Sequence, residues 1–566
     1  MMESQTFESP DSIGYNAIME KLNDPLLSDS SMISVMQLLK NGITTLDKHW
    51  ECLIGYILKL DWLRRDTLVV IEYKTFIVNL VSAHTYFLKA CLKSFVNQFK
   101  PGNAKKVGAS AGVSPDSMRT IHGTAFINIH SVLQAIIKIV PLTPTVLVPI
   151  LVDSYPLLTR PAYQHECYIK NLLHIARYLP QCRRKILVLI IGKLMELDSQ
   201  SPRRAVQDAL DENEEEDDGD MNVDNEESDI FRTDDVKVKE ESELASNQRD
   251  TELSHVEAHK LDVAMELLLH NITDTCIISG QLNWEETKKL YKELLGVFED
   301  VILVTHSSSH VQYLLFYICS FKQPLADGFI DYLWKKVKNP NTQPIYRQAA
   351  VAYMCGLISR GLFVPISTAV VTMEHMSQWI HSYIQQSSYS ECDDVPRHGT
   401  FYSVCQALFY IFIFRHKEIL QSNKGHQIAQ NLNFPSIVMC WLNPLKTCLP
   451  VIVKTFAAVT RQHQLAFCDT IIEHNKPTAF PVTKLYTTYI INSRTNQLES
   501  FFPFDPYILP RSKHAIEPLY REYSGNPIED DDNDSAGEDD DFLGDTSLIE
   551  SKSPTEFLVY RTSPGL

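Results

Sequence analysis

Apolar residues recur at helical spacing along most of this 566-residue chain, and short polar or proline-containing breaks separate the runs. Leu53, Ile57 and Leu60 mark one helical face in this way, and Leu172 and Ile175 lie on another. No segment combines a sustained alternation of apolar and polar residues with the Asn-Gly or Asp-Gly turns of β-hairpins. The pattern therefore predicts an all-α protein.

The lengths of the runs and breaks favour helix pairs stacked in repeats. A break at Pro141–Pro144, for example, precedes a predicted helix at Val146–Val152, and Pro180 separates two further helices. Helices of about 12–18 residues joined by short turns are typical of HEAT or armadillo repeats of about 40–47 residues. We therefore expect a HEAT/armadillo-like α-solenoid, whose long exposed faces are suited to binding proteins rather than to catalysis.

Two acidic tracts account for the formal net charge of −18. Asp211–Glu243 contains 17 acidic and three basic residues, and Glu529–Asp541 contains nine acidic residues and none that are basic. Removing their net charges of −14 and −9 leaves +5 for the remainder of the chain. Because strong binding to phosphates needs clustered lysine and arginine, this balance argues against strong direct DNA binding and favours protein partners.

Composition divides the chain into five regions. The acidic insertion and the tail are poor in apolar residues, so we expect both to be disordered. A long insertion is tolerated because the entropy cost of closing a loop rises only logarithmically with its length. The regions are a flexible N-terminus (1–27), N-terminal HEAT-like helical repeats (28–197), a disordered acidic insertion (198–253), C-terminal HEAT-like helical repeats with a closing extended segment (254–526), and an acidic Ser-Pro tail (527–566).

Catalytic, cofactor and metal motifs are weak. Gly108–Gly112 matches the GxSxG pattern of serine hydrolases, but it follows a loop rather than the strand which that chemistry requires, so a linker is the better interpretation. His306 and His310 have the i, i+4 spacing of metal ligands but no cysteine or carboxylate at ligand spacing. The twelve cysteines contain no CxxC pair and are expected to be reduced and buried. We expect no enzyme activity, no cofactor and no metal.

Two apolar stretches deserve comparison with membrane spans. Val132–Val152 contains Lys138 and three prolines, and Val404–Phe414 is shorter than the roughly 20 residues that a span requires. Buried helices of a large fold explain both stretches, so we expect no membrane segment.

Four ordered blocks carry a family resemblance. They are Ile129–Gln134, Val311–Tyr317, Phe401–Phe412 and Phe501–Tyr507. With these blocks, the chain resembles the RNA polymerase I-specific initiation factor family, which comprises transcription initiation factor IA and its fungal counterparts, between about residues 75 and 523. It departs from the family pattern at Gly356 and Ser359–Gly361, where a serine and an Ala-Arg-Ala-like run are expected.

The resemblance implies a non-catalytic HEAT-repeat adaptor in the nucleus and nucleolus. Such a factor binds RNA polymerase I subunits near the stalk and the promoter-bound selectivity factor, is a substrate of protein kinases, and allows a homodimer when free. It also implies a polymerase-binding serine patch on the N-terminal repeats, and Ser82, Lys89, Lys93 and Ser94 occupy that region. Ordinary solvent-exposed helix positions are an equally good interpretation of these serines.

The fourth block has a physical interpretation of its own. Two prolines exclude a helix, and the aromatic residues give the segment a surface to bury. We expect it to lie across the last helices and close the end of the solenoid, with docking of a partner as the alternative. Its candidate residues are Phe501, Phe502, Phe504, Asp505 and Tyr507.

Serine-proline pairs in polar segments suggest phosphorylation, which adds about −1.5 to −2 charges per site. The resemblance to a growth-responsive phosphoprotein makes Ser201, Ser553 and Ser563 the best candidates. Ser228 and Ser535, within the acidic tracts, resemble casein-kinase targets, although solvated linkers explain those tracts equally well. A different α-solenoid scaffold or a nuclear transport adaptor would share the helical pattern and the acidic loops, but not the four blocks.

Overall fold

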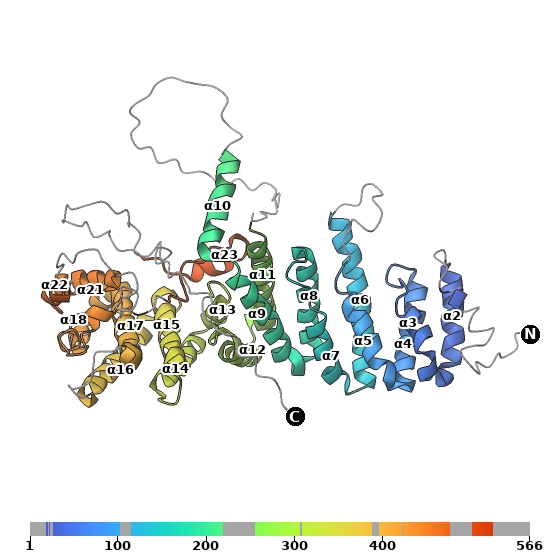
Figure 1. The fold of residues 1–566 in the computed structure, drawn as a ribbon, viewed down its shortest axis with the longest axis horizontal. Helices are drawn as coiled ribbons and strands as arrows, with labels where there is room; N and C mark the ends of the chain where they lie inside the picture. The colour runs from blue at the N-terminus through green and yellow to red at the C-terminus, as the bar shows by residue number, and fades with distance from the viewer. Residues whose placement is uncertain are drawn as a thin grey trace, which may run out of the picture. The chain divides into compact units, whose positions relative to one another are not determined.

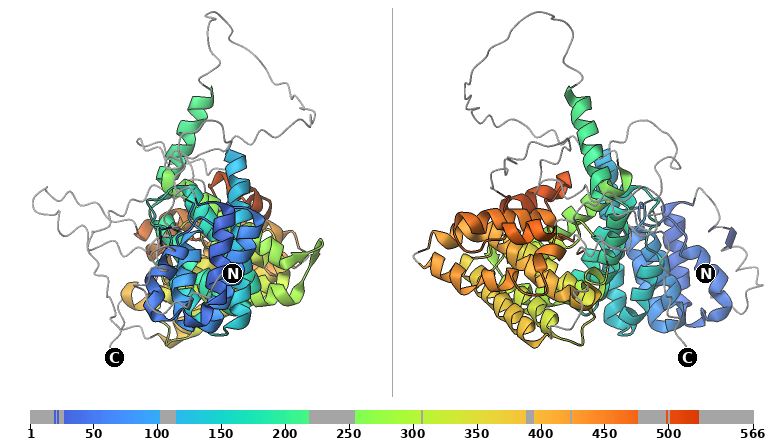
Figure 2. Two further views of the ribbon diagram at one scale, coloured as in Figure 1. Left: turned by 90° about the vertical axis from the view of Figure 1, so that its right-hand side faces the viewer. Right: turned by 60° about the vertical axis from the view of Figure 1, so that its left-hand side comes forward.

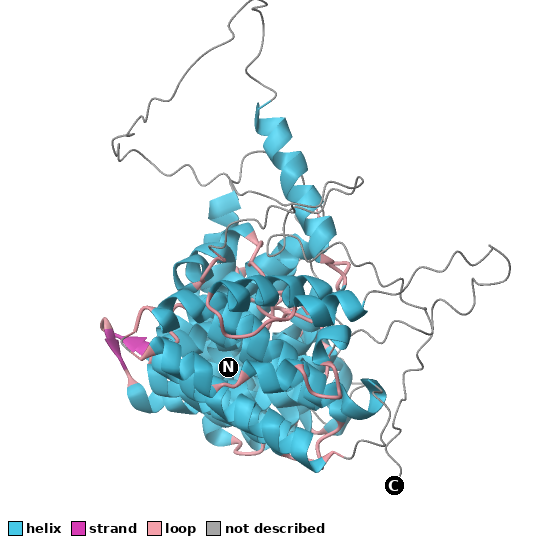
Figure 3. Cartoon of the chain, turned by 90° about the vertical axis from the view of Figure 1, so that its left-hand side faces the viewer, coloured by secondary structure: helices cyan, strands magenta, loops and turns pink. Residues whose placement is uncertain are grey.

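The chain is built almost entirely from helices, as predicted (Figure 3). The computed structural model describes residues 19–20, 22, 27–101, 115–218, 255–305, 308–387, 395–422, 424–475, 498 and 501–523. The chain forms two compact units. The first unit comprises residues 1–200 and 250–305, and the second comprises residues 201–249 and 306–566.

The first unit is a solenoid-like stack in which successive helices follow one another in chain order (Figure 1). Alternate helices pack together, and the ion pair of Lys40 with Glu72 at 2.8 Å joins two of them. This arrangement is that of stacked helix pairs. The elements are α2 (Asp29–Asn41), η1 (Ile43–Thr45), η2 (Lys48–Trp50), α3 (Glu51–Ile57), α4 (Thr67–Ala83), η3 (Thr85–Phe87), α5 (Leu88–Asn97), α6 (Pro115–Ile139), α7 (Thr143–Asp153), α8 (Ala162–Tyr178), η5 (Pro180–Cys182), α9 (Arg183–Ser199), α11 (Val256–Cys276), β1 (Ile277–Ile278), β2 (Gln281–Leu282), α12 (Trp284–Val297) and η6 (Phe298–Ile302).

Local sequence explains where these helices begin and end. Asp66 caps α4 by accepting a hydrogen bond from the amide of Leu68 at 3.4 Å, and the helix ends at His84, where the chain bends by 115° into η3 and α5. No single described helix is long and apolar enough to cross a membrane, and only this bent pair meets the criteria of length and composition when taken together.

Proline positions account for one difference from the sequence prediction. α7 begins at Thr143, earlier than predicted, because Pro144 occupies the first helical turn, where its missing N–H is not needed. Pro149 lies inside the same helix. Not every proline therefore marks a break between helices.

The boundary between the units differs from the predicted domain boundary. α11 and α12 follow the acidic insertion in sequence but pack on α8 and α9. Arg183 of α9 pairs with Glu293 of α12 at 2.5 Å, and Arg184 pairs with Asp300 at 2.7 Å. The first unit therefore extends through Thr305 rather than ending at the insertion.

The second unit is organised around α17, which packs against α15, α16 and α21 (Figure 2). The apolar stretch Val404–Phe414 lies in α17 and is almost completely buried, so it is a core helix. The elements of this unit are α10 (Arg203–Asp218), α13 (Tyr313–Ser320), α14 (Gln323–Lys338), α15 (Pro344–Arg360), α16 (Ile366–Gln386), α17 (Val395–Leu420), α18 (Gly425–Asn431), α19 (Phe434–Val438), α20 (Pro444–Thr447), α21 (Pro450–Gln462), α22 (Asp469–Asn475), α23 (Pro510–Ile516) and η8 (Glu517–Leu519).

Two further details depart from the sequence interpretation. α10 forms a helix within the predicted insertion 198–253, and its Val206 is fully buried. Ser279 and Gly280, with φ of 52° and 77°, form the turn of the short antiparallel hairpin β1–β2.

Candidate functional site

Residues 501–509, here called the closing segment, follow an extended path against the helices of the second unit. Phe504 and Tyr507 are buried, and Phe501, Phe502 and Asp505 are half-buried. The two prolines of the segment exclude a helix, and the aromatic side chains provide the buried surface.

Phe504 lies at the centre of an aromatic cluster. Its ring centroid is 5.4 Å from that of Tyr313, 5.2 Å from that of Phe316 and 5.9 Å from that of Tyr353. These rings come from α13 and α15, so one side chain joins two helices to the closing segment. Aromatic pairs at such distances contribute about 0.5–1.5 kcal/mol beyond the burial of their area.

Side-chain donors satisfy the backbone carbonyls of the closing segment. Gln312 Nε2 donates to the carbonyl oxygen of Pro503, and the Tyr313 hydroxyl donates to that of Asp505. The Tyr520 hydroxyl donates to the carbonyl oxygen of Phe504 at 3.0 Å. The segment has an internal backbone hydrogen bond from the Asp505 amide to the Phe502 carbonyl at 3.2 Å. The three side-chain donors supply partners for its other buried carbonyls.

The chain that follows the closing segment pairs with the end of α15. The Leu362 amide donates to the Leu519 carbonyl at 3.0 Å, and the Arg521 amide donates to the Arg360 carbonyl at 2.6 Å. The Arg360 side chain is 2% exposed, and its guanidinium lies over the ring of Phe414 at 4.7 Å and that of Tyr520 at 5.3 Å. Cation–π contacts of this kind stabilise a buried guanidinium.

A second buried arginine lies beside this junction. Arg415 is 1% exposed and donates to the carbonyls of Ile358 at 3.0 Å and Val364 at 3.2 Å. Its guanidinium pairs with Glu418 at 3.0 Å, and Arg521 approaches the same carboxylate at 3.5 Å. Burial lowers the pKa of Arg415. Because a buried charge is tolerated only when it is paired and hydrogen-bonded, this network is structural.

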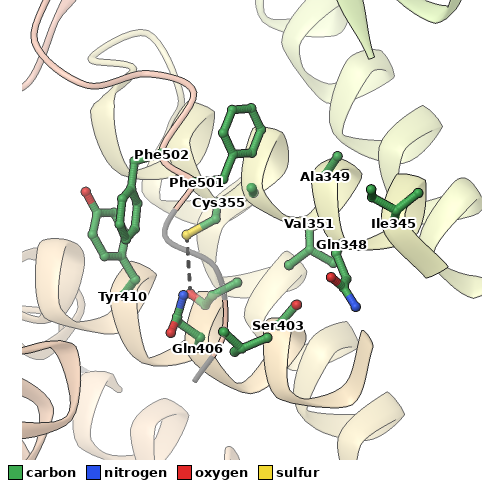
Figure 4. A pocket seen from close by; sticks show the side chains of 13 residues that line it. Ile345, Gln348, Ala349, Val351, Cys355, Ser403, Gln406, Tyr410, Phe501 and Phe502 are labelled. Carbon is green, nitrogen blue, oxygen red and sulfur yellow. Dashed lines mark hydrogen bonds between the residues drawn. The ribbon is translucent and has the colours of Figure 1, made fainter. Parts of the chain in front are cut away.

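A small pocket separates the closing segment from α15 and α17 (Figure 4). Its volume is about 70 Å³, and Gln348, Cys355 and Gln406 are among its lining residues. At its edge, the ring of Phe502 stacks on that of Tyr410 at 5.3 Å. A space of this size admits a few waters and is far smaller than the several hundred Å³ of typical ligand sites.

The four predicted polymerase-binding residues lie in the first unit. Ser82, at the end of α4, and Lys89 and Lys93, on α5, are exposed. Neither lysine forms an ion pair with any residue that the structure describes. Ser94 is half-buried, and its hydroxyl donates to the carbonyl of Leu58 at 2.7 Å, which gives it a structural contact. The opposite face of α5 is buried, so it presents the lysines at i, i+4 spacing on its outer face.

Of the predicted phosphorylation sites, only Ser201 lies among the described residues. Its side chain is fully buried, because α9 continues to Ser199 and α10 begins at Arg203 in place of a disordered segment. The expectation that Ser201 is accessible was therefore wrong. Ser228, Ser535, Ser553 and Ser563 lie outside the described residues.

The weak catalytic and metal motifs gain no support. Gly108–Gly112 and His306 lie outside the described residues. His310 is 1% exposed, and its ring packs against Tyr507 at 5.4 Å, so it is a core histidine. Within the described ranges, no group of three histidine, cysteine or acidic residues is arranged to hold a metal ion.

Sequence reasoning did not identify several residues that position the closing segment. Gln312 lies in the second resembling block and Arg360 in the Ser359–Gly361 departure, but neither was assigned a role, because their roles depend on contacts with residues more than 150 positions away. Gly356 was noted only as a departure from the family pattern. Tyr313 belongs to the second resembling block, which was the available signal for its importance.

Stacked helix pairs define a HEAT-like α-solenoid fold. The family model for RNA polymerase I specific transcription initiation factor RRN3 matches residues 3–528. The chain belongs to this family of RNA polymerase I-specific transcription initiation factors.

Individual relatives agree with this assignment. The chain is 37% identical to RNA polymerase I-specific transcription initiation factor RRN3 of Mus musculus, over 96% of this chain and 85% of the relative. It is 24% identical to the rrn3 factor of Schizosaccharomyces pombe, over 92% and 84%. The crystal structure of RNA Polymerase I Transcription Initiation Factor Rrn3 has the same fold, with a TM-score of 0.69 at 19% identity, covering 91% of this chain and 95% of that chain.

Proposed function

We propose that this protein is a non-catalytic adaptor that brings RNA polymerase I to the promoters of ribosomal RNA genes in the nucleolus. Membership of the RRN3 family supports a role in the initiation of transcription by RNA polymerase I. In this proposal one surface binds polymerase subunits near the stalk and another binds the promoter-bound selectivity factor. Simultaneous binding raises the local concentration of the two partners, which needs no chemical step by the adaptor.

The outer face of α5 is the proposed contact with the polymerase. Lys89 and Lys93 are exposed without an ion-pair partner among the described residues, and this is the observation that carries the assignment. Two adjacent uncompensated charges speed and orient the encounter with an acidic protein surface. Ser82 is exposed at the end of α4, seven residues before Lys89, whereas Ser94 is anchored within the fold by its hydrogen bond to Leu58.

Phosphorylation by protein kinases is the proposed means of regulation. A phosphate at Ser82, seven residues before Lys89, would add negative charge to this part of the first unit and so weaken an interface with an acidic partner. Ser553, Ser563, Ser228 and Ser535 remain candidates on the basis of their sequence context. A homodimer of the free protein would store the factor away from the polymerase.

An affinity pull-down of the tagged chain from nuclear extract, with copurifying proteins identified by mass spectrometry, tests the proposal. RNA polymerase I subunits are expected among the main partners. Charge reversal at Lys89→Glu and Lys93→Glu should remove them, while a Lys288→Glu and Lys292→Glu variant, with the same i, i+4 spacing on α12, should retain them. Import receptors in place of polymerase subunits would instead support the transport-adaptor alternative.

A further inference from the structure

Basic side chains gather where α6 and α8 begin. Residues 73–193 contain 15 lysines and arginines but only three acidic residues, Asp116, Asp153 and Glu166. Four basic residues, here called the basic edge, lie near the starts of α4, α6 and α8. They are Arg64, Lys100, Arg119 and Arg160.

Several contacts bring the basic edge together. Lys100 Nζ donates to the Ser154 carbonyl at 2.8 Å, and Gln164 Nε2 at the start of α8 donates to the Pro101 carbonyl at 2.9 Å. These bonds hold the end of the α5 segment against the loop that carries Arg160. Burial lowers the pKa of Lys100, and the nearby charge of Arg160 lowers it further.

Arg64 and Arg119 lie near a hydrogen-bonded pair formed by the buried His122 and Tyr163. His122 Nδ1 lies 2.9 Å from the Tyr163 hydroxyl, which links α6 to α8. Burial lowers the pKa of His122, with a further contribution from the charge of Arg64, and the charge of Arg119 acts on Tyr163. His122, Tyr163 and the neighbouring Gln164 therefore connect the four basic groups around the starts of α6 and α8.

Acidic groups near the basic edge leave most of this charge uncompensated. Glu166 pairs with Lys170 at 2.6 Å, and Asp153 is exposed at the end of α7. Arg64, Arg119 and Arg160 are exposed and form no ion pair with residues that the structure describes. Uncompensated positive charge of this density favours an acidic polypeptide as occupant.

The acidic tract Asp211–Glu243 begins within α10 of the second unit, and its C-terminal end leads back to the first unit near this edge. It ends 12 residues before His255, and α11, which begins at Val256, packs against α8 (Figure 1). Lys260 Nζ of α11 donates to the Leu158 carbonyl at 2.7 Å, two residues before Arg160. The 12 residues that lead from the tract to His255 span up to about 40 Å when extended. This exceeds the roughly 25 Å length of α8, a 17-residue helix, so the tract can reach the basic edge.

We propose that the acidic tract Asp211–Glu243 binds the basic edge of its own chain and competes there with acidic segments of partner proteins. The tract carries a net charge of −14, and its covalent attachment gives it a high effective concentration at the edge. This inference does not depend on the proposed function.

A labelled peptide of residues 211–243 tests the docking by fluorescence anisotropy. The receptor is the full chain in which every Asp and Glu of the tract is replaced by Asn or Gln, so that the edge is vacant. Arg119→Glu together with Arg160→Glu in this receptor should weaken peptide binding at least about tenfold, because attraction becomes repulsion at two positions. Lys138→Glu together with Lys185→Glu, also exposed in the first unit, is the matched control and should change binding less than about twofold.

A second comparison of peptide affinities tests whether the chain's own acidic tract occupies the basic edge. The unmodified full chain should bind the peptide at least about tenfold more weakly than the amide-substituted receptor, because its edge is already filled. Equal losses in the edge variant and the control variant would show nonspecific charge attraction and overturn the proposal. Equal affinity of the unmodified and the amide-substituted chains would overturn it as well. Circular dichroism of each variant checks that the helices are retained.

Discussion

Gly356 on α15 lies directly against the ring of Phe504, and a Cβ atom at Gly356 would come within 3.0 Å of Phe504 Cδ2. Real Cβ contacts are almost never shorter than this, so glycine permits the close approach of the closing segment to α15. The position at which the chain departs from the family pattern is therefore also a position where its packing needs a missing side chain.

Replacing Gly356 with alanine should loosen the closing segment. The added methyl group crowds the Phe504 ring, and overpacking of this kind costs about 1–3 kcal/mol, whereas the gain of about 1 kcal/mol in helix propensity is the same at any glycine inside a helix. Gly192 is the matched control, because it is also inside a helix and a Cβ there meets nothing within 4 Å. Urea unfolding should show Gly356→Ala to be less stable than Gly192→Ala, and the reverse order would disprove the packing argument.

Removing the ring of Phe504 should have a larger effect. Phe504 is 2% exposed, and its replacement by alanine should lower the free energy of unfolding of the second unit by about 3–4 kcal/mol. Phe467, which is 68% exposed, is the control, and its replacement should cost well under about 1 kcal/mol. Limited proteolysis should cleave the Phe504→Ala protein faster after residue 500. Equal cleavage of both variants would contradict the role assigned to Phe504.

The helical pattern and the absence of a helix in the closing segment were predictable because both depend on local sequence. The position of the segment was not, because it packs on α13 and α15 and not across the last helices. Apolar spacing marks α8 and α9, and the prolines and aromatic residues of the closing segment exclude a helix while favouring burial. The burial of Ser201 was not predictable, since it depends on α10 folding within a segment of acidic composition. The partners of Gln312 and Arg360 could not be predicted from the sequence either, because these contacts join residues that are far apart in the chain.

Acidification should destabilise the first unit through two buried histidines. Burial lowers the pKa of His130, next to His174 and hydrogen-bonded to Asn171, to about 4, and burial likewise lowers the pKa of His165 to about 4. Each pKa lies below the ordinary value of 6.5, so the unfolded chain takes up protons first as pH falls. The stability that these neutral histidines contribute is fully present above pH 6.5 and is lost as the pH falls toward 4.

The expected loss between pH 7 and pH 5 is about 1–2 kcal/mol for each histidine. Urea unfolding at the two pH values measures it. His130→Gln should reduce this loss by about 1–2 kcal/mol, even if the variant is less stable at pH 7, because the contribution of one buried imidazole is removed. An unchanged pH dependence in His130→Gln would show that the buried imidazole does not cause the effect.

A proline-directed kinase should discriminate among the Ser-Pro sites. Ser201 is fully buried in the native chain, so it should remain unmodified under conditions in which the urea-unfolded chain is phosphorylated at that position. Phosphopeptide mapping by mass spectrometry distinguishes Ser201 from Ser553 and Ser563, and a Ser201→Ala protein provides the control. Rapid modification of Ser201 in the native chain would show that α10 opens readily.

The most direct test of the adaptor account uses purified components. Promoter DNA carrying the selectivity factor is immobilised, and retention of RNA polymerase I is measured with and without the protein. The account predicts retention of polymerase only when the protein is added. It also predicts that the Lys89→Glu and Lys93→Glu protein still binds the selectivity factor but no longer retains polymerase. Retention of polymerase without the protein, or equal retention by the wild-type and variant proteins, would contradict the account.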